Sequence, residues 1–440
     1  MKRSFILTVL AALLLLPACD SFVEEVDRPK DSAGGDQLNN PDQVPFILNG
    51  VRAQWADATD FTTLAASLLS DQFRFGINGD ATFPTYFQLD SGIPERQSNT
   101  VDAAFNALGQ YRFLADDAVR RINNIEFGDE APVSKSEALF TAHLHGAVAR
   151  YYMATYFGLN PREGGGVIDR SDFIPSNAMY DSAAVKVDAA LSQSGLSERQ
   201  QKIANSVLAK IELYDGDYSE AATAAANGLQ EGDAPFEIKY SVQDTNEWWS
   251  NAGRGRVQVV AQDGAVNPNV EPSYRTDINI RDFRSVVAEN PGEQSRTTLV
   301  GVTEGAGFTD SLTAEDAIEF AQDKYPSEGA PIPFVNWEEM NLIRAELAAR
   351  GASDGNPTDL VNAVRSSFGL DELSDAGNLE TIAVERDRTL FAQGDRLVDQ
   401  RRFDFIPWHL NESFQNQTTW KYIPISQAEL DDNPNLNPSD

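Results

Sequence analysis

Two loops of the chain combine aromatic rings with hydrogen-bonding side chains, which is the mixture of residue types that a non-covalent binding site needs. Ring faces stack on flat apolar groups, whereas amide and guanidinium groups bind hydroxyl and carboxylate groups. One loop lies within residues 76–95, and the other lies around residues 246–275. The candidate ligand contacts in these loops are Tyr86, Asn246, Trp248, Trp249, Arg254 and Tyr274.

A structural role is also open to each aromatic ring in this set. Trp248 and Trp249 can equally pack their loop against neighbouring helices, and packing is the favoured role for Tyr86 and Tyr274. The two adjacent tryptophans in a polar loop are the best single candidates for ligand contact. Burial of each ring in the folded chain decides between the two roles.

Residues that could support catalysis or metal binding are poorly placed in the sequence. His143 and His145 are two residues apart on a predicted helix, which directs their rings to nearly opposite sides. The adjacent acids at 338–339 and 431–432 carry little information, because a chain with 67 aspartates and glutamates contains such pairs by chance. We therefore predict no catalytic residue, no metal site and no cofactor, and so a protein that is not an enzyme.

Charge and length restrict the possible partners and the organisation of the chain. The formal net charge is −32 at pH 7, and a field of this sign repels nucleic acid and anionic lipid. We therefore exclude nucleic-acid binding. The length of 440 residues exceeds the usual size of one compact core, so we expect several domains or a stacked helical array.

The first 18 residues have the pattern of a bacterial lipoprotein signal. An apolar run at 5–16, too short to span a bilayer, is followed by Ala18 and by Cys19, the only cysteine in the chain. An ordinary secretory signal is the alternative. In the favoured interpretation, cleavage leaves Cys19 as a lipidated N-terminus, and the polar segment 19–44 is a flexible tether to the membrane surface.

From residue 45 onward, apolar residues recur at helical spacing, which predicts a mostly α-helical fold. The segment 204–229 is typical of a tetratricopeptide-like hairpin, in which small residues let two helices approach closely. Because the helices do not recur at a regular interval, we expect tetratricopeptide-like hairpins in one bundle with long irregular loop insertions. The predicted helical segments are 46–69, 99–127, 138–161, 177–191, 204–229, 337–351 and 358–368.

Two segments stand apart within the predicted domain 45–440. Residues 232–332 have little helical periodicity and many Gly, Asn, Asp and Pro residues, so we predict an irregular insertion there. Insertions of this length are usually functional. Residues 333–440 form a C-terminal region that contains an unusual concentration of arginine.

Five arginines gather within residues 383–403 of this acidic chain. We predict one structural helix here, in which acids and arginines at spacings of three and four form a partly buried ion-pair network. A glycine inside this helix costs about 1 kcal/mol relative to alanine, so its expected benefit is close approach of a neighbouring backbone. A basic binding patch is the less favoured alternative. The structural residues are Glu385, Arg388, Gly394, Arg396, Asp399 and Arg402.

This stretch also carries a family resemblance. The run ERDRTLFAQGDRLVDQRR at 385–402 is similar to the C-terminal motif of the SusD/RagB family. The segments 331–351 and 422–436, together with the cysteine after the signal, resemble further features of that family in the same order. Gln393 stands where the family usually has an acid, and Gln400 stands where it usually has an apolar residue. Because of these two differences, one buried ion pair of the family is not expected with certainty in this chain.

The resemblance implies an outer-membrane lipoprotein of Bacteroidetes-type bacteria, exposed on the cell surface and held there by its lipid anchor. Family members have no catalytic centre. They bind oligosaccharides or other oligomeric nutrients and sit as a hinged lid on a SusC-like TonB-dependent β-barrel transporter, which imports the ligand. Sugars present flat C–H faces and hydroxyl groups, which suits the two aromatic loops. A surface adaptor that holds a protein partner on its helices, or a lipoprotein glycosidase, is the alternative.

Overall fold

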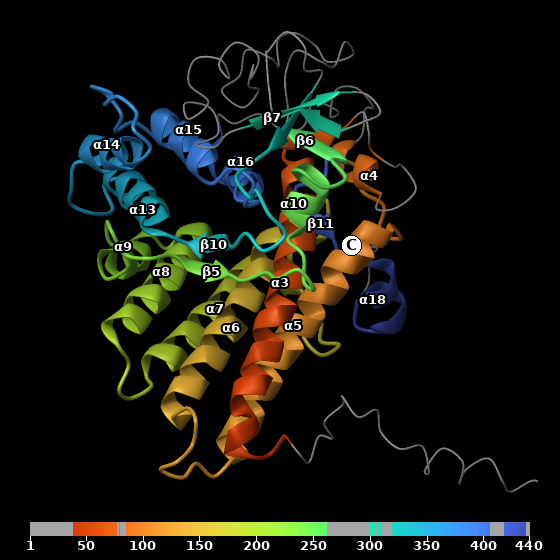
Figure 1. Cartoon of the computed structure of the whole chain (residues 1–440), viewed down its shortest axis with the longest axis vertical. Coiled ribbons are helices and arrows are strands. Elements are labelled where there is room, and N and C mark those ends of the chain that lie inside the picture. Colours follow the sequence, from red (N-terminus) through yellow and green to blue (C-terminus); the bar gives the residue numbers. More distant parts are fainter. Residues whose placement is uncertain are drawn as a thin grey trace, which may run out of the picture.

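The structure, a computed structural model, describes residues 38–76, 79, 85–261, 299–303, 307–309, 319–404 and 418–436. It is mostly helical, as predicted, and the long helices lie side by side in chain order (Figure 1). The segment predicted as a tether ends earlier than residue 44, because helical structure begins at Pro41. The helices are η1 (Pro41–Gln43), α3 (Val44–Leu69), α4 (Tyr86–Asp90), α5 (Asn99–Asn124), α6 (Lys135–Tyr156), α7 (Ser176–Leu191), α8 (Glu198–Asp215), α9 (Tyr218–Ala226), α10 (Glu247–Ala252), α13 (Trp337–Ala349), α14 (Pro357–Ser367), α15 (Leu379–Thr389), α16 (Arg396–Arg402) and α18 (Gln427–Asp432).

Short polar residues and glycine set the ends of the helices. At the start of α8, the hydroxyl of Ser197 accepts the N–H of Gln200 at 3.3 Å, and the side chain of Gln200 accepts the N–H of Ser197 at 2.9 Å. The helix ends at Gly216 in the left-handed conformation, with φ at 93°, and Asp217 then caps α9. The hairpin predicted within 204–229 therefore has the tight turn that brings α8 and α9 together.

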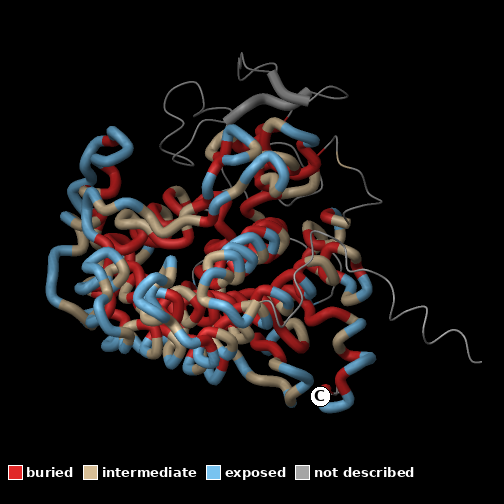
Figure 2. The backbone as a smooth tube through the Cα atoms, turned by 60° about the horizontal axis from the view of Figure 1, so that its bottom comes forward, coloured by how far each residue is buried: buried red, intermediate tan, exposed pale blue. Residues whose placement is uncertain are grey.

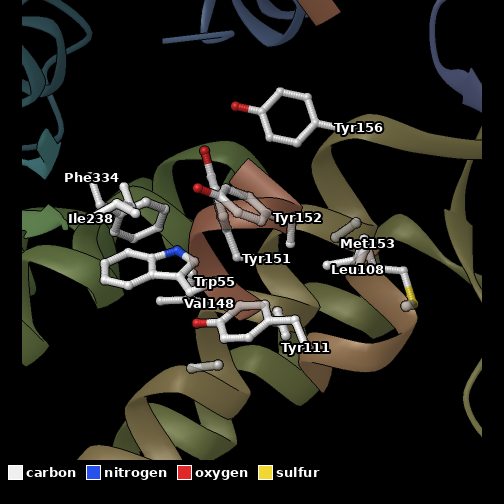
Figure 3. Close-up of a cluster of buried hydrophobic side chains, with 14 of the residues drawn as sticks. Trp55, Leu108, Tyr111, Val148, Tyr151, Tyr152, Met153, Tyr156, Ile238 and Phe334 are labelled. Atoms are coloured by element: carbon white, nitrogen blue, oxygen red, sulfur yellow. The ribbon is translucent and has the colours of Figure 1, made fainter. Parts of the chain in front are cut away.

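The main core lies among α3, α5 and α6 and is rich in aromatic side chains (Figure 3). Trp55 packs against Phe236 and against His145, with ring centroids 4.9 and 5.0 Å away. The hydroxyl of Tyr111 hydrogen-bonds Nδ1 of His145 at 2.7 Å, and burial lowers the pKa of His145 to about 3. The imidazole is therefore neutral and belongs to the core. Buried residues follow the inner faces of the helices, and exposed residues follow their outer faces (Figure 2).

Short strands join the loops into small sheets. One sheet has the order β11-β2-β3-β4, and a side chain on Gly158 or Gly164 in this sheet would collide with the ring of Tyr422. The other sheets have the orders β1-β6, β10-β5 and β8-β7-β9. The strands are β1 (Phe73–Phe75), β2 (Phe157–Asn160), β3 (Glu163–Gly166), β4 (Ile174–Pro175), β5 (Phe236–Ile238), β6 (Val259–Ala261), β7 (Leu299–Thr303), β8 (Gly307–Thr309), β9 (Glu319–Gln322), β10 (Ile332–Val335) and β11 (Ile423–Pro424).

The described parts of the predicted irregular insertion 232–332 contain short elements of secondary structure. These elements are α10 and five strands, β5 to β9. β6 and β9 are buried along their whole length, so they lack the alternation of apolar and polar residues that identifies a half-exposed strand in a sequence. β6 pairs with β1, which attaches the insertion to the chain segment that follows α3.

The arginine-rich stretch forms two helices, so the prediction of one helix over 383–403 is wrong. Residues 390–395 separate α15 from α16, and within them Ala392 and Gly394 have left-handed φ values of 61° and 83°. Glycine adopts this conformation without a steric cost. A Cβ on Gly394 would lie 3.2 Å from the Cα of Thr63 in α3. The expected close backbone approach is therefore present, but at a turn and not inside a helix.

The charged side chains of this stretch are mostly buried and paired. Arg386 has 0 % exposed surface and donates from Nε to Asp399 at 2.9 Å and from Nη2 to the hydroxyl of Tyr214 at 3.0 Å. Arg402 contacts Asp399 at 2.7 Å and also pairs with Glu346. Loss of one partner would leave a buried charge without compensation, so the network fixes α15 against α16. Further pairs are Arg365–Glu385 (2.8 Å), Arg388–Glu385 (3.1 Å) and Arg396–Asp387 (3.9 Å).

We expect Gly394→Ala to lower the free energy of unfolding by about 2–4 kcal/mol, because both left-handed backbone strain and overpacking act on a side chain there. Urea denaturation followed by circular dichroism measures this loss. Gly50→Ala is the matched control, since Gly50 is exposed in α3 and an added Cβ meets nothing within 4 Å. It should be neutral or stabilising by up to about 1 kcal/mol. Equal denaturation midpoints for the two variants would contradict the dependence of this turn on glycine.

Candidate functional site

The described parts of the two aromatic loops, which include α4 and α10, lie at one end of the long helices (Figure 1). α4 contacts β1, β1 pairs with β6, and both β6 and β9 contact α10. We call the surface formed by α4, β1, β6, β9 and α10 the α10 face. The packing of these helices and strands determines which of the candidate side chains remain accessible to a ligand.

Trp248 has the packing role, which corrects its interpretation as a ligand contact. Its side chain is fully buried, its Nε1 donates to Oγ1 of Thr63 in α3 at 3.0 Å, and its ring lies edge-on to Phe73 with centroids 4.9 Å apart. Successive residues on a helix point about 100° apart, so α10 cannot turn both tryptophans inward. Trp248 therefore anchors α10 on α3.

Asn246 is also a structural residue, which corrects the same interpretation. Its Oδ1 accepts the N–H groups of Trp248 at 2.9 Å and of Trp249 at 3.2 Å, so it caps the N-terminus of α10. Its Nδ2 donates to the carbonyl of Ala330 at 2.7 Å. Both ends of the buried amide are used within the protein, and neither is offered to a ligand.

Asp60 of α3 is a site residue that the sequence reasoning missed. Its Oδ2 accepts the N–H of Glu247 at 3.0 Å, and its Oδ1 accepts the hydroxyl of Tyr240 at 2.7 Å. Burial raises the pKa of Asp60 well above its usual range. These partners lie 187 and 180 residues away in the chain, so no local pattern distinguishes Asp60 from the other acids.

Tyr86 is buried in α4, and burial raises the pKa of its hydroxyl. The packing alternative therefore describes Tyr86, and its interpretation as a ligand contact is corrected. Tyr274 and the predicted lipidation site Cys19 lie outside the described residues. Their roles stay predictions.

Trp249 and Arg254 are the candidates that keep accessible surface. Trp249 is half-buried, and the side chain of Arg254 is 28 % exposed. Two parallel contacts hold the guanidinium of Arg254 against Asp323, with Nε–Oδ1 at 2.6 Å and Nη2–Oδ2 at 2.9 Å. Phe87 of α4, 40 % exposed, adds an aromatic ring to the same face. Aromatic rings can stack on an apolar ring face of a ligand, and a fixed guanidinium and carboxylate can bind hydroxyl groups.

Two acidic residues near α10 pair with each other. The carboxyl groups of Asp57 and Asp244 hydrogen-bond each other, and burial raises the pKa of both. Within the described part of the chain, no group of three or more His, Cys, Asp or Glu side chains could hold a metal ion. The helices of that part include none that is long and apolar enough to cross a membrane.

Lys324 connects the α10 face to the arginine-rich stretch. It follows Asp323, the partner of Arg254, and its ammonium group donates to the carbonyls of Thr389 at 3.1 Å and Phe391 at 2.9 Å. Oε1 of Gln393 lies 3.5 Å from the ammonium nitrogen, so a neutral amide stands where an acid would supply a counterion. Burial lowers the pKa of Lys324 to about 7.

We expect Lys324 to make folding more favourable as the pH rises from about 7 to 10.5, the interval between its pKa in the folded chain and its usual value. In this interval only the unfolded chain holds the proton, so a higher pH favours the folded state. The unfolding free energy of the wild type, relative to Lys324→Met, should increase by up to about 1.4 kcal/mol per pH unit. Urea denaturation from pH 6 to 9 measures the difference, with the exposed Lys239→Met as control. Parallel curves for the wild type and Lys324→Met would refute this assignment.

No family model and no curated protein matches the chain. Solved structures align with it along most of both chains. A SusD homolog from Bacteroides thetaiotaomicron aligns with a TM-score of 0.66 and 13 % identity, over 93 % of this chain and 99 % of that chain. A putative sugar binding protein from Bacteroides vulgatus aligns with a TM-score of 0.65 and 15 % identity, over 90 % and 97 %.

A third similar structure is the surface glycan-binding protein A from Bacteroides thetaiotaomicron in complex with laminarihexaose. It aligns with a TM-score of 0.60 and 14 % identity, over 90 % of this chain and 99 % of that chain. At these identities the likeness concerns the fold. The chain has the SusD-superfamily fold, as the resemblance of its arginine-rich motif predicts.

Proposed function

We propose that the protein is a cell-surface lipoprotein that binds an oligosaccharide on the α10 face and delivers it to a SusC-like TonB-dependent β-barrel transporter in the outer membrane. The observation that carries this proposal is the shared fold over 90 % of the chain with proteins that include a surface glycan-binding protein in complex with laminarihexaose. In this proposal the protein is a receptor and not an enzyme.

The accessible chemistry of the α10 face supports the class of ligand. Trp249 offers part of an aromatic face for stacking, and the Arg254–Asp323 pair holds a guanidinium and a carboxylate in fixed positions, which are groups that bind hydroxyls. Buried contacts of Trp248 and Asn246 hold α10 in place, so little order needs to be gained when a ligand binds. We propose Trp249 and Arg254 as ligand contacts, with Tyr274 as a further candidate.

The N-terminal features support the proposed location. Lipidation of Cys19 would hold the protein at the membrane without a spanning segment, and the tether that follows would let the folded body reach a transporter. The lipid anchor, the tether and the partner transporter are all parts of this proposal.

We expect Trp249→Ala to weaken the binding of laminarihexaose by at least about tenfold, which corresponds to roughly 1.4 kcal/mol and to the loss of one stacked ring. Isothermal titration calorimetry on the full chain measures this change, with maltohexaose and xylohexaose as further probes if laminarihexaose does not bind. Phe113→Ala is the matched control, because it removes an exposed aromatic ring from α5. Trp248→Ala should instead lower stability by about 3–5 kcal/mol. Equal affinities of Trp249→Ala and the wild type would remove the α10 face from the proposal.

We expect the tagged protein to co-purify with a stoichiometric β-barrel of TonB-dependent size after gentle solubilisation of outer membranes. Mass spectrometry of the captured material identifies the partner. Cys19→Ala should leave the membrane fraction, because its anchor is lost. Capture of the protein alone, or with a soluble partner, would contradict the transporter role and favour the adaptor. Release of shorter sugars from the probes would favour the glycosidase.

A further inference from the structure

A small polar cavity lies in the interior of the protein, where α3, the end of α6, α8, β5, β10 and the turn at 390–395 meet. Its volume is about 10 Å³, and almost all of the residues that line it are buried. Neither Trp249 nor Arg254 lines it, so it is separate from the α10 face. The side chains that give the cavity its chemistry are Thr59, Tyr151, Tyr152, Tyr156, Lys210 and Asp395.

Three tyrosine hydroxyls at the end of α6 gather at this cavity (Figure 3). Tyr151, Tyr152 and Tyr156 have at most 2 % exposed surface. Burial raises the pKa of all three hydroxyls, so each of them keeps its proton. Since bulk water does not reach these side chains, each proton needs an acceptor inside the protein.

The described residues do not provide an acceptor for every one of these protons. The hydroxyl of Tyr152 lies 2.9 Å from Oγ1 of Thr59, and either oxygen can donate. The hydroxyl of Tyr151 has no hydrogen bond of regular geometry with a described residue, and it interacts with that of Tyr156. Whichever of these two hydroxyls donates to the other, the second proton has no acceptor in the described part of the chain. An unpaired buried hydroxyl destabilises the folded state.

Asp395 brings an acceptor oxygen to the same cavity. Its Oδ1 accepts the hydroxyl of Tyr214 at 2.7 Å and lies 3.0 Å from the ammonium nitrogen of Lys210. Its Oδ2 accepts no hydrogen bond from any residue that the structure describes. A small group that accepts from a tyrosine hydroxyl and donates to Oδ2 would satisfy both sides of the cavity.

The charges and the size of the cavity favour one neutral molecule. The ammonium group of Lys210 compensates Asp395 and also lies 2.9 Å from Oε1 of Glu339. An anion would be repelled by these two carboxylates, and a cation would be repelled by Lys210. A cavity holds a single water molecule from about 10–15 Å³ upward, so there is no room for a larger molecule.

We propose that this cavity is a binding site for one water molecule, which accepts a hydrogen bond from the hydroxyl pair of Tyr151 and Tyr156 and donates one to Oδ2 of Asp395. The hydroxyl of Tyr214, which donates to Asp395, accepts from Arg386 at 3.0 Å. The water therefore connects the aromatic core at α6 to the buried ion pair that fixes α15 against α16. This site is independent of oligosaccharide binding on the α10 face.

A crystal structure of the full chain at a resolution of about 2 Å or better tests the proposal, because ordered buried waters are visible at such resolution. We expect one density peak about 2.5–3.0 Å from Oδ2 of Asp395 and from the hydroxyl oxygen of Tyr151 or Tyr156. After a soak in sodium bromide, this peak should give no anomalous signal. The lack of a peak, or a peak without contact to Asp395, would overturn the proposal. A bromide signal would assign an anion and would also overturn it.

Tyr151→Phe tests the same site in solution by thermal melts. Removal of a hydroxyl that takes part in the water network should lower the melting temperature by about 1–2 °C. Removal of an unpaired hydroxyl should raise it instead, so the sign of the change separates the two cases. Tyr218→Phe is the matched control and should melt like the wild type, because Tyr218 is half-buried and its hydroxyl forms no hydrogen bond with a described residue.

An unchanged or raised melting temperature of Tyr151→Phe would contradict the proposed network. A lower melting temperature together with a crystal structure that has no peak would assign a direct hydrogen bond between Tyr151 and Tyr156, and the water site would be rejected.

Discussion

The buried guanidinium of Arg386 is the constraint on which the C-terminal half of the fold depends. A charge without exposed surface has to be paired, because an unpaired buried ion costs several kcal/mol. Its partner Asp399 is 13 residues further along the chain, and one straight helix would hold the two about 20 Å apart. The chain must therefore fold back between them. The left-handed residues Ala392 and Gly394 provide this turn. The backbone of Thr63 lies so close to Gly394 that the turn cannot accept a side chain at this position.

The same turn determines where the α10 face lies. The turn leaves backbone groups without helical hydrogen bonds, and two side chains bind them. Gln72, next to β1, accepts the N–H of Ala392. Lys324, close to β9, donates to the two carbonyls described above. Both strands belong to the framework of the α10 face. Lys324 also directly follows Asp323, which holds Arg254. The turn of the arginine-rich stretch is therefore linked to Arg254, a proposed ligand contact. The link runs through Lys324, which binds backbone carbonyls at the turn and follows Asp323 in the chain.

The sequence predicts those parts of the fold that local signals specify, such as the long helices, whose apolar periodicity and caps lie within each segment. It does not separate Trp248 from Trp249, since the two have the same side chain and the same neighbours. Thr63, 185 residues earlier, determines which ring is buried. The single helix predicted over 383–403 fails for a similar reason. Its apolar spacing continues through the turn, and the left-handed conformation there is imposed by α3 and by the ion pair of Arg386.

The net charge of −32 bears on the kind of oligosaccharide that the α10 face can bind. A neutral oligosaccharide does not respond to the field of the protein, so an open surface with an aromatic ring and a paired arginine is sufficient to bind it. A sugar acid is repelled by the protein as a whole, although beyond about 8 Å this repulsion is screened at physiological ionic strength. At contact distance the guanidinium of Arg254 is already paired with Asp323, so it does not offer an acidic sugar an unpaired positive charge. The proposed site on the α10 face therefore suits a neutral chain better than an acidic one.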